Sequence, residues 1–292
     1  MTDSRSPFFD GSFRATDQSL DIAAEIAKLV GQPFDPEDTR QFVGRLHRTY
    51  YESIIATLGL DGEKIGFASG SAKHVAAFVP RLGTTVHLDE HLDFWTFTLT
   101  HLLTVAACKP LPDDERAKLL ALYQFAANPI LFPSRHPQAR DQLLPWMRAH
   151  PDCLQLSHAL SRAMTVFVIC HEIAHAVLGH PHQEAAESHE FQADALAVDY
   201  FRRIQQAGTR VDWIYVHEKM LVAPLLLLRL VALAERLLQQ EASETPPHRS
   251  HPNAVERARR VEELLGPAIT DGARYILNGF SAALDDIQLD FR

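Results

Sequence analysis

The sequence predicts a mainly α-helical protein, a helical bundle around one buried helix with a small β-hairpin or edge sheet beside it. Most segments repeat apolar residues every three or four positions, which is the spacing of one helix face. Only two short segments resemble strands, and a chain of 292 residues that is 46% hydrophobic can bury a substantial core. We expect a flexible N-terminus over residues 1–18 and a single domain over 19–292, divided into an N-terminal helical and β part (19–150) and a part that holds the most distinctive motif (151–292).

The predicted helices have ends marked by residues that start or stop helices. Gly31 and Pro33 end the first helix, and Pro36 stands at the first position of the second. Pro224 interrupts the very apolar run 220–228, which is too short to cross a bilayer and is expected to be a core helix. In chain order the predicted helices are 19–30, 35–58, one from His91 to the stop at Lys109-Pro110, 113–125, 157–179, 184–204, 212–240 and one that begins at Ser250-His251-Pro252.

Residues 73–79 and 84–88 are the predicted strands, because both are short and bounded by turn residues. The pair could form an edge that holds an extended substrate by backbone hydrogen bonds. A structural hairpin is the interpretation that the sequence alone favours. The proline-rich loop over 128–137 could cover a site, although a plain connection is the ordinary role of such a segment.

Composition argues against several classes of function. The net charge is −9 and basic residues do not cluster beyond the short run 257–260, so we expect no nucleic-acid partner. No apolar stretch at the N-terminus resembles a signal peptide, and we expect a cytoplasmic protein without stable membrane insertion. Three scattered cysteines (Cys108, Cys153 and Cys170) are typical of free thiols in a reducing compartment.

The most distinctive motif is His171-Glu172-Ile173-Ala174-His175, inside the apolar run 163–179. Residues four apart lie on one helix face, so both imidazoles can reach a single metal ion. Glu172 comes one position round the helix, where it can act as the base for an attacking water. Because this pentapeptide can also arise by chance, the hypothesis needs a third ligand.

Glu190 is the candidate for that ligand. It lies four residues before Asp194 in the predicted helix 184–204, so the two carboxylates share a face. A glutamate can complete a His/His/Glu zinc site, and an aspartate one turn on can hold a ligand imidazole by its other ring nitrogen. Alone, the two carboxylates would be interpreted as solvated surface groups. Together with His171 and His175 they predict a zinc site.

Rival ligand sets fit the sequence less well. A three-histidine site would need Gly and His where the chain has Leu178 and Pro181. His180 is interpreted as a histidine at the C-terminal end of the motif helix. Asp212 is interpreted as the N-cap of the following helix.

The segments 171–175, 190–194 and 250–257 together read His-Glu-Ile-Ala-His, Glu-Phe-Gln-Ala-Asp and Ser-His-Pro-Asn-Ala-Val-Glu-Arg. This series resembles the Lit-type phage-exclusion metallopeptidases and is more distantly similar to membrane-associated zinc endopeptidases of the HtpX type. The close match covers about Val168–Arg257.

The resemblance implies an α+β, zincin-like fold with zinc held by His171, His175 and Glu190, and with Glu172 as general base. It places His251 and Arg257 near the site. It also implies an intracellular protein substrate, for the Lit type a translation elongation factor. The chain departs from the HtpX type in lacking membrane helices, and its N-terminal half departs from the Lit pattern.

From these residues we expect a soluble zinc metalloendopeptidase of the gluzincin type, with a possible role in phage exclusion or stress response. His251, at a predicted loop-to-helix corner, is the candidate oxyanion donor, with a resting-state metal ligand or a helix cap as alternatives. The rival function is a zinc-containing sensor or regulatory module without significant turnover. The sequence leaves the substrate, the activating trigger and the oligomeric state open.

Overall fold

The computed structural model describes residue 24 and residues 36–70, 77–89, 91–127, 143–184, 186–207, 217–241 and 253–290. Its elements are α2 (Pro36–Leu58), β1 (Gly66–Gly70), β2 (Ala77–Phe78), β3 (Thr85–Asp89), α3 (His91–Cys108), α4 (Asp113–Ala127), a helical segment over 143–149, η1 (Pro151–Cys153), α6 (Leu154–Leu178), η2 (His180–His182), α7 (Glu187–Ala207), η3 (Glu218–Val222), α8 (Ala223–Glu241), α9 (Ala254–Leu265), η4 (Gly266–Ala268) and α10 (Asp271–Asp290). The prediction of a mainly helical protein with a small sheet is confirmed.

Several predicted features lie outside the described residues: the N-terminus over 1–18, the helix 19–30 apart from residue 24, the loop 128–137, Asp212 and the corner at His251.

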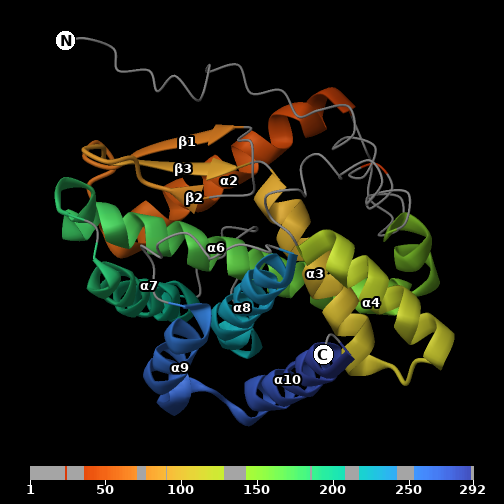
Figure 1. Cartoon of the computed structure of the whole chain (residues 1–292). Helices are drawn as coiled ribbons and strands as arrows, with labels where there is room; N and C mark the ends of the chain where they lie inside the picture. The colour runs from red at the N-terminus through yellow and green to blue at the C-terminus, as the bar shows by residue number, and fades with distance from the viewer. Residues whose placement is uncertain are drawn as a thin grey trace.

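Helix α6 lies at the centre of the molecule. Figure 1 shows the sheet and α2 on one side of α6 and the helices α7, α8, α9 and α10 on the other. Most of its side chains are buried, because its sequence is apolar on nearly every face. The helix ends at Gly179, whose φ of 71° is a left-handed conformation that glycine adopts without strain. The predicted motif helix over 157–179 is therefore confirmed, with an earlier start.

The sheet has three strands in the order β1-β3-β2. β2 and β3 are antiparallel, so the predicted hairpin is confirmed for 77–78 and 85–89, while 73–76 lie outside the described residues. β1 pairs with β3 in parallel and was not predicted, because glycines at both of its ends make it look like a turn. The backbone N–H of Leu82, in the turn between β2 and β3, donates to the carbonyl of Pro181 at 2.9 Å. This bond joins the sheet to the segment that follows α6.

A polar network joins four elements across the N-terminal half. Nε2 of His47, on α2, lies 2.6 Å from Oδ2 of Asp93 on α3. Nδ1 of the same ring lies 3.0 Å from the hydroxyl of Ser69 on β1, and the hydroxyl of Thr165 on α6 donates to Asp93. His47 is fully buried, so its two partners offset the cost of removing its polar ring atoms from water.

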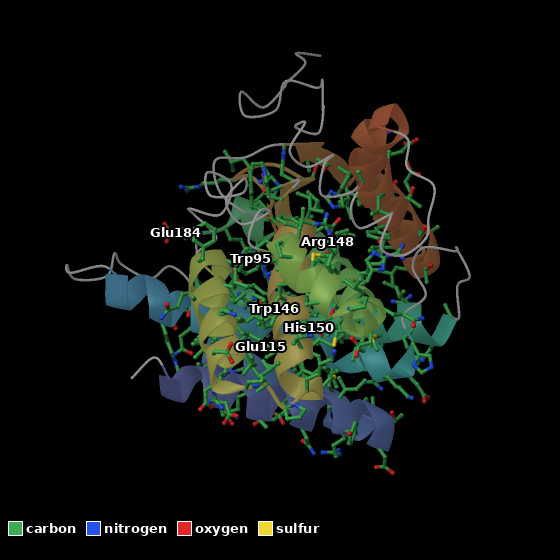
Figure 2. The ribbon with its side chains drawn as sticks, turned by 90° about the vertical axis from the view of Figure 1, so that its right-hand side faces the viewer. Trp95, Glu115, Trp146, Arg148, His150 and Glu184 are labelled. Carbon is green, nitrogen blue, oxygen red and sulfur yellow. The ribbon has the colours of Figure 1, made fainter. Side chains whose placement is uncertain are left out.

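Aromatic side chains pack between the elements on the side of the molecule formed by α3, α4 and residues 143–149. Figure 2 looks onto this side and labels Trp95, Trp146 and His150. Trp95 donates its indole N–H to the carbonyl of Ala126 at 3.0 Å, which ties α3 to the end of α4. The ring of Trp146 packs against that of His150, with centroids 4.6 Å apart.

Among the described residues, one helical stretch is long and apolar enough to cross a membrane by length and composition, Pro151–Leu178. It contains α6, and 67% of the apolar window is buried inside the fold. A helix that is mostly buried in the core of a fold passes the same test of length and composition. The cytoplasmic location stays a prediction.

Candidate metal centre

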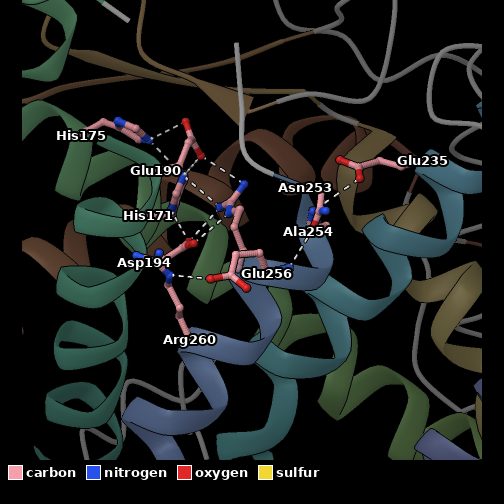
Figure 3. Close-up of polar contacts among 10 residues, drawn as sticks. His171, His175, Glu190, Asp194, Glu235, Asn253, Ala254, Glu256 and Arg260 are labelled. Atoms are coloured by element: carbon pink, nitrogen blue, oxygen red, sulfur yellow. Dashed lines mark hydrogen bonds and ion pairs between the residues drawn. The ribbon is translucent and has the colours of Figure 1, made fainter. Parts of the chain in front are cut away.

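Two helices, α6 and α7, bring most of the predicted site residues together. α6 provides His171, Glu172 and His175, and α7 crosses it to present Glu190 and Asp194. The figure of the site shows the two histidines facing the two carboxylates across the space between these helices (Figure 3). His171, Glu172, Glu190 and Asp194 are all buried, as the apolar surroundings of the motif require. The predicted i,i+4 pairing on both helices is confirmed.

The donor atoms of His171, His175 and Glu190 converge on one point. The Nε2 atoms of the two rings are 3.0 Å apart. Oε2 of Glu190 lies 3.4 Å from Nε2 of His171, and Oε1 lies 3.4 Å from Nε2 of His175. Two ring nitrogens this close need a proton or a cation between them. Ligand atoms about 2.0–2.1 Å from a tetrahedral metal lie about 3.3 Å from one another, so these three residues could hold a metal ion.

Asp194 holds the other side of the His171 ring. Its Oδ1 lies 3.0 Å from Nδ1 of His171. Arg257, on α9, donates to both oxygens of this carboxylate, from Nε at 2.7 Å and from Nη2 at 2.8 Å. Nη1 of Arg257 also lies 3.1 Å from Oε2 of Glu190. The guanidinium therefore orients Asp194 in the two-pronged geometry that arginine forms best, and it contacts Glu190 through its remaining amino group.

A second contact fixes α9 against α7. The guanidinium of Arg260 lies over the ring of Phe191, 3.5 Å from its centroid, and Nε of Arg260 donates to Glu256 at 3.0 Å. Phe191 is the residue between Glu190 and Gln192, so this cation–π contact joins α9 to the part of α7 that carries Glu190. Arg257 reaches the site from a helix that is held in place independently.

The electrostatics of the site favour a cation. Three carboxylates, those of Glu172, Glu190 and Asp194, surround one guanidinium, that of Arg257. Burial lowers the pKa of His171, but the carboxylates of Asp194 and Glu190 outweigh it and bring this pKa to about 9. Burial raises the pKa of Asp194, and the hydrogen bonds from Arg257 and His171 bring it below its ordinary value. The excess of negative charge attracts protons or a metal ion to the histidines.

Glu172 differs from the other two carboxylates. Burial raises its pKa, and the neighbouring His171 and His175 oppose this shift only in part. A carboxylate with a raised pKa binds a proton more tightly than an ordinary surface glutamate. This is the property required of a group that accepts a proton during a reaction.

The structure also brings in residues that the sequence did not assign to the site. His180 does stand at the end of α6, as predicted, but its Nδ1 lies 2.9 Å from Nδ1 of His175. Its Nε2 lies 3.0 Å from Oε1 of Gln192, and its ring stacks on that of His189 with centroids 4.2 Å apart. Burial lowers the pKa of His180, which favours the neutral ring. The sequence had offered one indication, a histidine directly after the helix-ending Gly179.

The start of α9 is described from Asn253. The side chain of Asn253 accepts a hydrogen bond from the backbone N–H of Glu256 at 2.8 Å, so Asn253 is the N-cap. His251, two residues earlier, lies outside the described residues, and its predicted role stays a prediction.

Comparisons with known proteins gave no match: none with protein-family models, curated proteins or solved structures. The interpretation of the site depends on its own side chains.

Proposed function

We propose that the protein is a zinc-dependent metalloendopeptidase, with zinc bound by His171, His175 and Glu190. Two imidazoles and one carboxylate are a frequent ligand set of catalytic zinc, which keeps a further position open for water or substrate. A structural zinc site is normally closed by four protein ligands. Among the described residues, His171, His175 and Glu190 form a group of possible metal ligands, with one ligand atom from each residue within 4.8 Å of the others.

The observation that carries the proposal is the burial of Glu172 beside this donor set. Bound zinc would lower the pKa of water to about 7 and polarise a peptide carbonyl. Glu172 would accept the proton of the attacking water and pass it to the leaving amine, so one carboxylate would serve both steps. A site that holds zinc only for folding has no use for a buried base next to its ligands.

The substrate class is proposed from the sequence resemblance alone. Lit-type peptidases cleave an intracellular translation factor, so we propose a cytoplasmic protein substrate and a role in phage exclusion or stress response. The negative net charge and the lack of long basic clusters support a protein substrate over nucleic acid.

The test is to incubate the purified, zinc-loaded chain with a cell lysate and to map new protein N-termini. Glu172→Gln is the matched control, because it keeps the size of the side chain and removes the base. We expect a small set of new N-termini that is absent with chelator and absent with Glu172→Gln. New N-termini from both proteins would exclude Glu172 as the base. Zinc bound by both without any cleavage would favour the sensor or regulatory module.

A further inference from the structure

The second histidine ligand has a partner of a different kind from the first. His171 faces a carboxylate, Asp194, whereas His175 faces another imidazole, that of His180. Two nitrogens 2.9 Å apart form a hydrogen bond only when one carries the proton and the other offers its lone pair. The direction of this bond decides which nitrogen of His175 can bind a metal.

Gln192 supplies that direction. Its Oε1 lies 3.0 Å from Nε2 of His180, and an amide oxygen can only accept. Nε2 of His180 must then carry the proton, which leaves Nδ1 of this neutral ring as an acceptor. Nδ1 of His175 donates to it, and Nε2 of His175 keeps its lone pair.

The opposite direction is incompatible with a metal. If Nδ1 of His180 donated to His175, Nε2 of His175 would carry a proton and point it toward Nε2 of His171, 3.0 Å away. The His175 lone pair would then face away from Glu190, and one of the three ligands would be lost. Only one arrangement of protons lets both histidines offer Nε2 to the same ion.

We propose that His180 and Gln192 are positioning residues that fix the metal-binding tautomer of His175. The inference rests on the proposed zinc site. His180, a neutral ring, would support His175 as the Asp194 carboxylate supports His171. Gln192, in the Glu-Phe-Gln-Ala-Asp segment, would in turn support His180.

The backbone around His180 is arranged to hold its ring in place. The left-handed conformation of Gly179 turns the chain at the end of α6, and the ring of Pro181 fixes the backbone φ of the residue that follows His180. The carbonyl of Pro181 accepts from the N–H of Leu82, so the sheet anchors this turn. On α7, the ring of His189 stacks on that of His180 with an angle of 8° between the planes. The imidazole is therefore supported by three elements.

Two variants separate the hydrogen bond from packing. His180→Phe keeps a flat ring against His189 but removes the acceptor. His180→Asn places an amide oxygen where Nδ1 stood and keeps the acceptor. We expect zinc affinity, measured by competition with a chromogenic chelator, to fall about 10- to 100-fold in His180→Phe and to stay close to the parent value in His180→Asn. His182→Phe, an exposed change in the same turn, is the matched control and should leave the affinity unchanged.

Gln192 allows a second comparison. It is exposed, so water can replace its amide oxygen in part, and we expect a smaller loss for Gln192→Leu than for His180→Phe. Gln192→Glu offers a carboxylate oxygen to the same N–H and should preserve the affinity. A larger loss for Gln192→Glu than for Gln192→Leu would contradict the assigned direction.

The tautomers can be observed directly in the parent protein. In long-range ¹H–¹⁵N spectra of histidine-labelled, zinc-loaded protein, we expect His175 to carry its proton on Nδ1 and His180 on Nε2. A proton on Nδ1 of His180, or zinc affinity of His180→Phe equal to that of the parent, overturns the positioning role of His180 and Gln192 alone. A parent chain that binds no zinc overturns the proposed function, and the positioning role of His180 and Gln192 with it. Absence of peptidase activity with zinc bound bears only on the proposed function.

Discussion

Oδ1 of Asp194 lies 3.0 Å from Nδ1 of His171, on the side of the ring away from the Nε2 that faces Glu190. The two atoms are at ion-pair distance without the alignment of a regular hydrogen bond. A nearby carboxylate favours a proton on Nδ1, which leaves Nε2 free for a metal. Because Asp194 is 2% exposed, this orientation is not weakened by competition from water.

Asp194→Ala is therefore expected to weaken zinc affinity about 10- to 100-fold. Asp194→Asn keeps the shape and can still accept through its amide oxygen, so it should lose less. The measurement is a chelator competition titration on each folded variant. Asp199→Ala, an exposed carboxylate on the same helix, is the control. Equal affinities for Asp194→Ala and the parent would show that Asp194 is an ordinary helix carboxylate.

Arg257 is expected to matter for stability as well as for the site. Its side chain is 16% exposed and pairs with two buried carboxylates, and removal of one partner from a buried ion pair typically costs about 3–5 kcal/mol. We expect Arg257→Gln to lower the free energy of unfolding of the metal-free protein by an amount in this range. Arg257→Lys should recover only part of it, because an ammonium group cannot donate to Asp194 in the two-pronged geometry. Urea unfolding checks both variants.

Arg260→Gln is the comparison for Arg257→Gln. Arg260 is half exposed, and its contacts are a cation–π contact to Phe191 and a surface ion pair to Glu256. Such contacts contribute about 1 kcal/mol or less at exposed sites. If the two variants were equally destabilised, the buried contacts of Arg257 would have no special role.

Glu172→Gln is expected to retain zinc and to lose at least ~10²-fold in peptidase rate, the lower end for acid–base groups. The reason is that glutamine keeps the size and hydrogen bonding of the side chain but cannot accept the proton. Metal content is measured by elemental analysis and activity on a substrate found in the lysate experiment. Loss of the metal in this variant would instead assign Glu172 a structural role.

His251 is the predicted oxyanion donor. If His251 donates to the oxyanion, His251→Ala should lower kcat roughly 10²–10³-fold and retain zinc. A ligand of a resting form would give the opposite sign, a higher basal rate. The cap alternative is weakened because Asn253 already caps α9. A His251→Ala enzyme as active as the parent would refute the oxyanion role.

Spacing along the chain was enough to predict that His171, His175 and Glu190 form a group that could hold a metal ion. His171 and His175, and Glu190 and Asp194, are each four apart in strongly helical segments, so the local helix fixes their common face. The contact of His180 with His175 was missed because it depends on the turn at Gly179, which sends the ring back over the helix. No periodicity in the sequence encodes that reversal.

The sheet and the polar network show the same limit. The β2–β3 hairpin is a local structure and was predicted, whereas β1 joins β3 in parallel, a pairing that depends on the packing of α2. The contacts of His47 with Ser69 and Asp93 join three elements far apart in the sequence. Single-sequence patterns predict faces of helices and strands, and they do not predict which polar groups meet between elements.

The last prediction concerns acid stability and Asp93. Burial raises the pKa of Asp93, but His47, the hydroxyl of Thr165 and Arg162 outweigh this effect, so its pKa in the folded protein is below the ordinary value. The ionised carboxylate therefore stabilises the fold above the ordinary pKa of about 4, and this stabilisation is lost as the pH falls through the lower folded value.

Asp93→Asn is accordingly expected to be less stable than the parent near neutral pH. The difference between the two should shrink as the pH falls below about 4, because the parent then loses the same charge. Unfolding by urea at a series of pH values measures this. Asp114→Asn, at an exposed carboxylate with an i,i+4 ion pair to Lys118, is the control and should change stability by about 0.5 kcal/mol or less. A stability difference for Asp93→Asn that stays constant from neutral to acid pH would show that the contacts of Asp93 do not depend on its charge.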